Sequence, residues 1–467
     1  MRVTLFAPLR TLLNLDTTLA LGEAAAFCGA LQTAANKVGE RCTAEVRRDS
    51  TPDNNLQKFF NLDNDSVTWY AKPLVRLTPC ESDRSALHAA GVAGSFLESS
   101  LTVRSMHLDV FDNTIAVAFV DLDIDLAAVH EAIMADAGVK AGDLTPAAVL
   151  ETALTRYSAV IAERMQPSLV EPFVRALRAA TRRLGFWRFG GRQPLSTIVR
   201  KPENWVAFDD ISDRAVGDGW TWDDRASPLV WSHRVYHVDT FEPGEADHAN
   251  ALFRITEPEG PLVIKHGTSY LGEGARKEKY FEVSIYAQYF AVLLDTVKVS
   301  QRRLEQILSE PAENVDLSRA QAKADRIESL FVEVTAELSD LTSSLQDINA
   351  EIFDAITEAF TFSGLRESIK ERLQASELKL SRVLDIRRRL QQRLVGLMLF
   401  FIGGAQLLSL VIDLYGLRTE YGEDDGVPGP MDVIVTNPID LSLNVLTLGL
   451  LLVGLVYVVM KSDRAKR

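Results

Sequence analysis

Apolar residues are distributed unevenly along the chain, and two long apolar stretches near the C-terminal end dominate the pattern. Residues 394–417 are apolar apart from three polar positions, and residues 441–460 carry no charge. At 1.5 Å per helical residue, about 24 and about 20 residues are long enough to cross a bilayer. The pattern therefore predicts two transmembrane helices, with residues 418–440 forming the loop between them.

The charges that flank these stretches predict their orientation. Arg387, Arg388, Arg389 and Arg393 precede the first stretch, residues 461–467 form a basic tail after the second, and the connecting loop is acidic. Cytoplasmic flanks of membrane helices collect Lys and Arg. We therefore expect a multi-pass protein of the cell's inner (plasma) membrane, in contact with membrane lipid and with both termini in the cytoplasm.

The apolar period upstream of the first stretch predicts a helical stalk over residues 276–393. From Ile327 to Ile352, apolar residues alternate at spacings of four and three, which is typical of a coiled coil or a helical hairpin. We expect Gly364 to interrupt this pattern, after which an apolar stripe continues into the first apolar stretch. Such a rod would transmit a displacement along its length, and an inert packing helix is the alternative.

Residues 1–275 mix the periods of strands and helices, which predicts an α+β cytoplasmic domain. Alternating apolar residues over 100–122, with a turn near Asp112, indicate a β-hairpin. Further strands are predicted at 229–238 and 262–264, and helices at 126–137 and 146–184. The expected fold class is thus an α+β cytoplasmic domain, a long helical stalk with a coiled coil, and two transmembrane α-helices.

Composition narrows the classes of function. The formal net charge is -14, which argues against nucleic acid as a partner because a phosphate backbone requires basic surface. Three cysteines lie far apart, with no spacing typical of a zinc site or a disulfide framework. We find no catalytic sequence motif, so we do not expect an enzyme, and no cofactor is expected.

Two groups of side chains contain residue types that bind metal ions. Asp121, Asp123 and Asp125 alternate with apolar residues, which on a strand would place three carboxylates on one face. A divalent-cation site and a solvated strand edge are the two interpretations. His233 and His237 lie four residues apart in a predicted strand, where their side chains would share a face but stand too far apart to bind one metal.

The first apolar stretch carries a polar stripe. Gln406, Ser409 and Asp413 are spaced three and four residues apart, so they share one face of a helix. One interpretation is that the stripe lines a pore in an oligomer. The other is that Gln406 and Ser409 join neighbouring helices while Asp413 lies at the level of the lipid headgroups.

The order of these features resembles the CorA-type magnesium transporter superfamily. Members of that family join a cytoplasmic α/β domain, through a long stalk helix, to a first span, a short acidic external loop, a second span and a basic tail. Their signature Tyr-Gly-Met-Asn ends the first span, where this chain has Tyr415, Gly416, Leu417 and Arg418. The acidic residues Glu420, Glu423, Asp424 and Asp425 resemble the external loop of the family.

The resemblance implies a homo-oligomer, a pentamer in the family, that acts as a cation channel or transporter gated by its cytoplasmic domain through the stalk. Arg418 replaces the asparagine that helps to hold the hydrated cation, and a ring of arginines would repel a divalent ion. This departure favours the alternative, a CorA-derived effector or signalling or scaffold protein that binds a ligand or partner and does not transport magnesium. A membrane tether without a pore is a third possibility.

Overall fold

The computed structural model describes residues 1–15, 24–39, 41–48, 72–135, 146–183, 185–188, 191–194, 199–200, 228–238, 253–255, 262–264, 267–272, 276–310, 315–345 and 347–421 of the 467-residue chain. The chain divides into two compact units, Met1–Ile386 and Arg387–Arg467, which are described separately.

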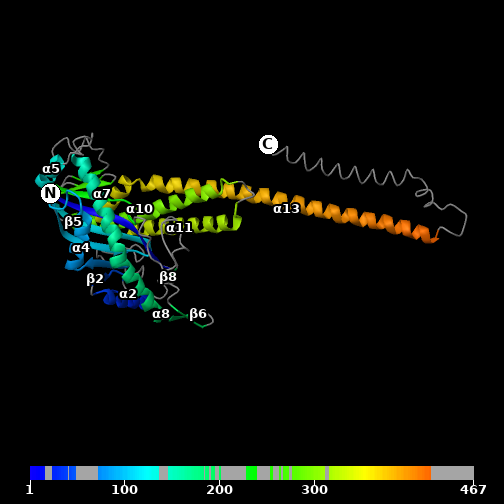
Figure 1. Ribbon diagram of the computed structural model, residues 1–467, viewed down its shortest axis with the longest axis horizontal. Coiled ribbons are helices and arrows are strands. Elements are labelled where there is room, and N and C mark those ends of the chain that lie inside the picture. The colour runs from blue at the N-terminus through cyan, green and yellow to red at the C-terminus, as the bar shows by residue number, and fades with distance from the viewer. Residues whose placement is uncertain are drawn as a thin grey trace. The chain divides into compact units, whose positions relative to one another are not determined.

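A ten-stranded sheet forms the centre of the first unit (Figure 1). Its strands follow the order β10-β11-β12-β9-β1-β5-β4-β3-β2, and β8 pairs with β1 beside this path. The bounds are β1 Arg2–Leu15, β2 Cys42–Val46, β3 Val75–Pro79, β4 Leu101–Val110, β5 Asn113–Ile124, β8 Val199–Arg200, β9 His233–Val238, β10 Phe253–Ile255, β11 Leu262–Ile264 and β12 Thr268–Gly272. All neighbours are antiparallel except β9 and β12, which are parallel. A separate hairpin joins β6 (Gly185–Arg188) and β7 (Gly191–Pro194).

Helices cover both faces of this sheet. One face packs against α2 (Ala24–Val38), α4 (Glu81–Val92), α5 (Leu126–Ala135), α7 (Pro146–Met165) and α8 (Glu171–Arg183), and a π-helical turn at Gln166–Val170 joins α7 to α8. The other face packs against α10 (Arg276–Ile307), α11 (Leu317–Ser344), α12 (Asp347–Ala359) and the beginning of α13 (Phe362–Tyr421). The first unit is therefore a three-layer α/β/α arrangement.

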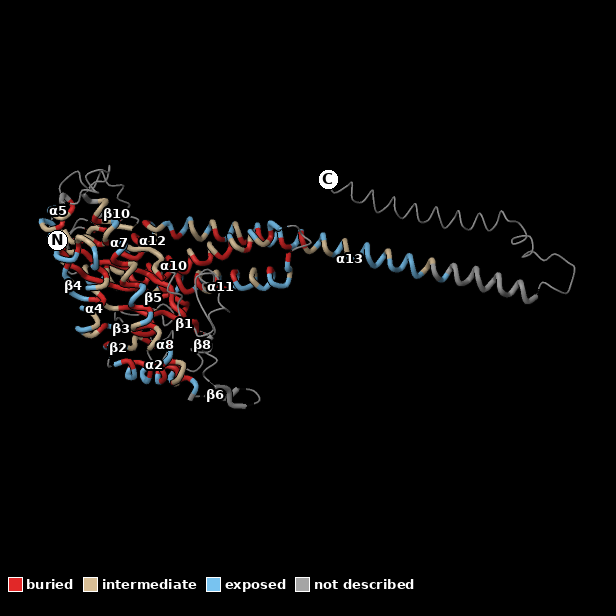
Figure 2. The backbone as a smooth tube through the Cα atoms, viewed as in Figure 1, coloured by how far each residue is buried: buried red, intermediate tan, exposed pale blue. Residues whose placement is uncertain are grey.

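Strand β1 supplies side chains to both hydrophobic cores because successive residues of a strand point to opposite faces. Val3 and Leu5 pack in the core beneath α7 and α8, whereas Phe6 packs in the core beneath α10. Every residue of β1 from Val3 to Leu15 is buried, as Figure 2 shows for the centre of the sheet. Its sequence is therefore largely apolar and lacks the alternation of apolar and polar residues that is typical of a half-exposed strand.

The stalk helices α10 and α11 pack along the predicted apolar positions. Ile327, Val334, Leu338 and Leu341 are buried in one cluster with α10. The predicted pattern does not form a single helix, however, because α11 ends at Ser344 and a separate helix, α12, follows. The helical hairpin was therefore the better of the two interpretations.

The interruption that was predicted at Gly364 lies elsewhere. Gly364 is inside α13, and the break between α12 and α13 falls at Phe360 and Thr361. Thr361 has a φ of 53°, in the left-handed region that ends a helix. A glycine inside a helix is tolerated at a modest cost, so its presence alone did not locate the break.

Several predicted elements of the first unit are confirmed. The hairpin over 100–122 corresponds to β4 and β5, which pair in antiparallel register around a turn at Asp112. The predicted strands correspond to β9 and β11, and the predicted helices to α5 and to α7 with α8. The predicted helix over 146–184 is divided by the π-helical turn, which contains Pro167, a residue that removes a helical hydrogen bond.

The prediction of transmembrane helices is wrong. Within the described ranges, no helix combines the length and the apolar character that crossing a bilayer requires. This finding corrects the predicted fold class and also the predicted multi-pass membrane location and ion transport. The predicted second span, residues 441–460, lies outside the described residues.

Candidate functional site

A cleft of about 570 Å³ in the first unit is lined by residues of strands β9 and β12, of helices α5 and α7 and by Met1. Its apolar wall includes Leu126, Val129 and Ile133, which are spaced three and four residues apart on one face of α5, and Leu150 of α7. Cavities of about 300–1,000 Å³ with mostly apolar walls are typical of small-molecule sites. The size and lining of this cleft fit that class of site.

Two tyrosines line the cleft. Tyr236 of β9 and Tyr270 of β12 occupy paired positions of the parallel strands, so their side chains project from the same face of the sheet. Their rings are stacked, with 5.7 Å between centroids and 27° between planes. Burial raises the pKa of Tyr236 to about 12, so its phenol is neutral at physiological pH.

One carboxylate lies among the described lining residues. Glu151 of α7 faces the cleft, and its Oε2 lies 3.6 Å from Nη2 of Arg234 on β9. Arg234 also donates to the backbone oxygen of Glu151 (3.3 Å) and to Oγ1 of Thr155 (3.2 Å). These contacts attach the start of α7 to the sheet and fix the position of Glu151 at the cleft.

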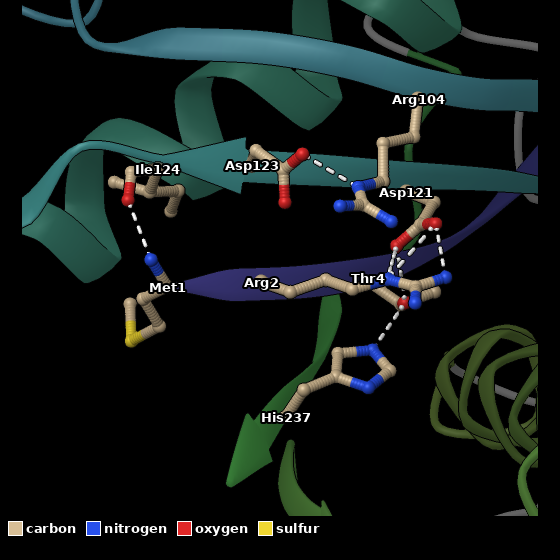
Figure 3. A network of polar contacts seen from close by, with 8 residues as sticks. All are labelled: Met1, Arg2, Thr4, Arg104, Asp121, Asp123, Ile124 and His237. Atoms are coloured by element: carbon tan, nitrogen blue, oxygen red, sulfur yellow. Dashed lines mark hydrogen bonds and ion pairs between the residues drawn. The ribbon is translucent and has the colours of Figure 1, made fainter. Parts of the chain in front are cut away.

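A polar network supports the same end of the sheet from its other face (Figure 3). Arg2 donates to both carboxylate oxygens of Asp121, at 2.6–3.1 Å. Thr4 donates to Asp121 (3.1 Å), and its Oγ1 lies 2.9 Å from Nε2 of His237. The network joins β1, β5 and β9, the strands next to the cleft.

The acidic triplet does not form a shared cation site in this structure. Asp121 is paired with Arg2, Asp123 accepts from Arg104 (2.5 Å), and Asp125 accepts from the backbone at the start of α5. No group of three metal-ligating side chains occurs within the described parts of the chain. Each carboxylate instead accepts hydrogen bonds from a different partner in the protein. The triplet therefore forms neither a divalent-cation site nor a simple solvated strand edge.

His233 and His237 have separate partners on the core face of β9. Nε2 of His233 lies 3.1 Å from Oγ of Ser269, and its ring contacts Phe6. His237 contacts Thr4 and the ring of Phe281 instead. The two imidazoles therefore serve packing and hydrogen bonding within the domain.

A buried polar cluster connects the sheet to the stalk. Arg48, which follows β2, forms an ion pair with Asp112 in the β4–β5 turn, and Tyr289 of α10 donates to Asp112 (3.2 Å). Asn113 donates to the same tyrosine oxygen (2.9 Å). Glu337 of α11 is buried beside this cluster, and burial together with the nearby Asp112 charge raises the pKa of its carboxyl group well above the ordinary value. This buried polar cluster thus combines side chains from the sheet, α10 and α11.

The sequence-predicted pore residues are not part of the cleft. Gln406 is exposed on α13. The structure describes only the backbone of the other predicted residues of this helix. These are Ser409, Asp413, Tyr415, Gly416, Leu417, Arg418 and Glu420. Glu423, Asp424 and Asp425 lie outside the described residues.

Comparisons with protein-family models, with curated proteins and with solved structures returned no match. They therefore neither support nor oppose the resemblance to the CorA-type superfamily, which stays a prediction.

Sequence reasoning missed the cleft. Its residues come from five separate segments of the chain, and the parallel pairing of β9 with β12 brings two of them together. One signal was present in the sequence: Leu126, Val129, His130 and Ile133 form one face of a short helix that starts immediately after a strand.

Proposed function

We propose that the chain is a ligand-binding signalling or scaffold protein that assembles with copies of itself. Its sheet domain binds a small, largely apolar molecule in the cleft, and the stalk relays the bound state to α13. This proposal keeps the binding function that was predicted as the alternative to transport. It involves no catalysis and no nucleic-acid partner. The net charge of -14 disfavours binding to a phosphate backbone.

The single observation that carries the proposal is the cleft. It combines an apolar wall from α5 with a pair of tyrosines and one carboxylate, as small-molecule sites commonly do. Leu126 is 48% exposed at its mouth, so a ligand in the cleft would cover apolar surface that now faces water. Covering apolar surface supplies about 25 cal/mol per Å².

The stalk offers a physical route from the sheet to α13. Helix α10 packs on β1 and β5 with one side and on α11 and α12 with the other. Gln301 of α10 donates to the backbone oxygen of Ile369 in α13 (2.8 Å), and Arg372 of α13 pairs with Glu305 at 3.5 Å. A shift of α10 against the sheet would therefore displace the beginning of α13.

Self-association through α13 is the part of the proposal that concerns partners. In the second unit, seven large apolar side chains of this helix are at least 37% exposed: Leu394, Val395, Met398, Leu399, Phe400, Phe401 and Ile402. Contiguous exposed apolar surface of this kind marks interaction sites. Every copy presents the same stretch, so association of identical helices would cover it.

The proposal is tested by the binding of N-phenyl-1-naphthylamine, a neutral apolar fluorescent probe, to the full-length protein. We expect saturable binding that Leu126→Lys weakens at least tenfold, because the charged side chain would occupy the mouth of the cleft. The matched control is Leu378→Lys, at a comparably exposed leucine of α13, which should leave this binding unchanged. Equal binding by both variants and the wild type would refute a ligand site in the cleft.

A further inference from the structure

The distribution of charge in the cleft identifies the class of ligand. Among the described residues that line it, Glu151 is the one acidic side chain, and no lysine or arginine belongs to the lining. The lining also includes Met1, whose terminal ammonium donates to the backbone oxygen of Ile124 (2.7 Å), so that this cation is held at the end of β5 (Figure 3). His130 is the remaining titratable group besides the tyrosines.

Glu151 retains capacity to bind a second cation. Its side chain is 44% exposed, and its distance to the Arg234 guanidinium, 3.6 Å, is longer than a direct charge-assisted hydrogen bond. Arg234 has other acceptors in Thr155 and Thr268 and in the backbone of α7. An ionised carboxylate accepts hydrogen bonds at about four lone-pair sites, so one long contact leaves most of them accessible.

The tyrosine pair favours the same sign of charge. The faces of aromatic rings are electronegative and attract cations, most strongly where water is partly excluded. The rings of Tyr236 and Tyr270 are stacked, and both residues line the cleft together with aliphatic side chains of α5 and α7. Because the Tyr236 phenol stays neutral well above physiological pH, its ring presents this attraction without a competing negative charge.

From this arrangement we infer that the cleft binds an organic cation, an amine or quaternary ammonium group carried on an apolar body. The cationic group lies between Glu151 and the two tyrosine rings, and the apolar body lies against Val129, Ile133 and Leu150. The inference rests on the proposed function, since it names the ligand class of the same cleft.

Three probes with one alkyl chain and different head groups test this inference on the full-length protein: octyltrimethylammonium, 1-octanol and octyl sulfate. Isothermal titration below the micellar range should give a dissociation constant for octyltrimethylammonium at least tenfold lower than that for octyl sulfate. Glu151→Gln should weaken binding of the cation at least fivefold and leave binding of 1-octanol unchanged. Glu163→Gln, at an exposed glutamate of the same helix, is the matched control and should change neither.

The outcomes separate the two proposals. If octyl sulfate binds as tightly as the cation, or if Glu151→Gln leaves cation binding unchanged, the ligand class is refuted while a ligand site in the cleft stands. If none of the three probes binds and N-phenyl-1-naphthylamine binding is insensitive to Leu126→Lys, both proposals fall. Tyr270→Leu provides a second test, because loss of one ring should weaken binding of the cation more than binding of 1-octanol.

Discussion

Arg48 and Asp112 form an ion pair in the interior of the domain, with 2.8 Å between Nη2 and Oδ2 and side chains that are 0% and 2% exposed. The pair joins the end of β2 to the β4–β5 turn, and Tyr289 ties it to α10 through Asp112. Buried charges are costly to desolvate, so such a pair holds together only while both partners are present. The packing of the sheet against the stalk helix α10 therefore depends on this pair.

Removal of one partner of this pair should strongly destabilise the fold. We expect Arg48→Met to lower the free energy of unfolding by about 3–5 kcal/mol, because Asp112 would be left as an uncompensated buried charge. The control is Arg84→Met, which removes an exposed contact of 4.0 Å to Glu81 and should cost less than about 1 kcal/mol. Urea unfolding followed by circular dichroism measures both values, and equal losses would contradict the role of the buried pair.

Glu337 should make the stability of the domain fall as pH rises. Burial and the Asp112 charge raise its folded-state pKa above the unfolded value, so the folded state binds more protons between the two values. The stabilisation is therefore present below the unfolded pKa, about 4.3, and is lost as pH rises toward the folded pKa. Glu337→Gln should remove this dependence, and its stability relative to the wild type should increase as pH rises above the unfolded pKa.

The groups that face Glu337 come from several elements, so the measurement requires a matched control. Besides Asp112, they include Arg48, which favours ionisation, and Glu333 and Asp340 of the same helix, which oppose it. Glu328→Gln, at an exposed site of α11, should leave the pH dependence unchanged. If thermal melts of Glu337→Gln and wild type shift in parallel with pH, the carboxyl group does not titrate as described.

Two helix glycines should respond in opposite directions to replacement by alanine. A Cβ atom at Gly91 of α4 would lie 2.5 Å from Cε2 of the buried Tyr157 side chain, so Gly91→Ala forces α4 and α7 apart and should cost about 1–3 kcal/mol. Gly29 of α2 is exposed with open space at its Cβ position, so Gly29→Ala should gain about 0.5–1 kcal/mol of helix stability. Thermal denaturation of the two variants decides the signs, and a stabilised Gly91→Ala would contradict the α4–α7 packing.

The apolar stretch of α13 should drive self-association. We expect the full-length protein to sediment as a homo-oligomer, and Leu399→Glu to lower its mass because a charge would replace a contact between helices. Leu378→Glu places the same change at an exposed leucine before this stretch and should leave the mass unchanged. A monomeric wild type, or an oligomer indifferent to Leu399→Glu, would remove the proposed partner surface.

The sequence was most informative for elements with a recognisable apolar period. The β4–β5 hairpin and α5 were predicted close to their observed bounds, and the helix predicted over 146–184 covers α7, the π-helical turn and α8. Strand β1 gave no such signal, since it is buried on both faces and contains Pro8. Without an alternating pattern, a short apolar run does not distinguish a buried strand from part of a helix.

The membrane prediction failed for a related reason. The length of two apolar stretches alone led to the prediction of bilayer spans, whereas no helix in the described part of the chain is both long and apolar enough to cross a bilayer. The cleft was inaccessible to sequence reasoning because Glu151, Tyr236 and Tyr270 are distant in the chain. Their association depends on the pairing of β9 with β12 and on the Arg234 contacts to α7, which no local pattern encodes.

The location of a bound ligand tests the central claim most directly. Hydrogen–deuterium exchange of the full-length protein, with and without octyltrimethylammonium, reports which segments the ligand protects. The cleft predicts slower exchange in α5, in β9 and β12 and at the start of α7, and loss of this protection in Glu151→Gln. Unchanged exchange in these segments, or protection confined to residues 394–402 of α13, would contradict the account.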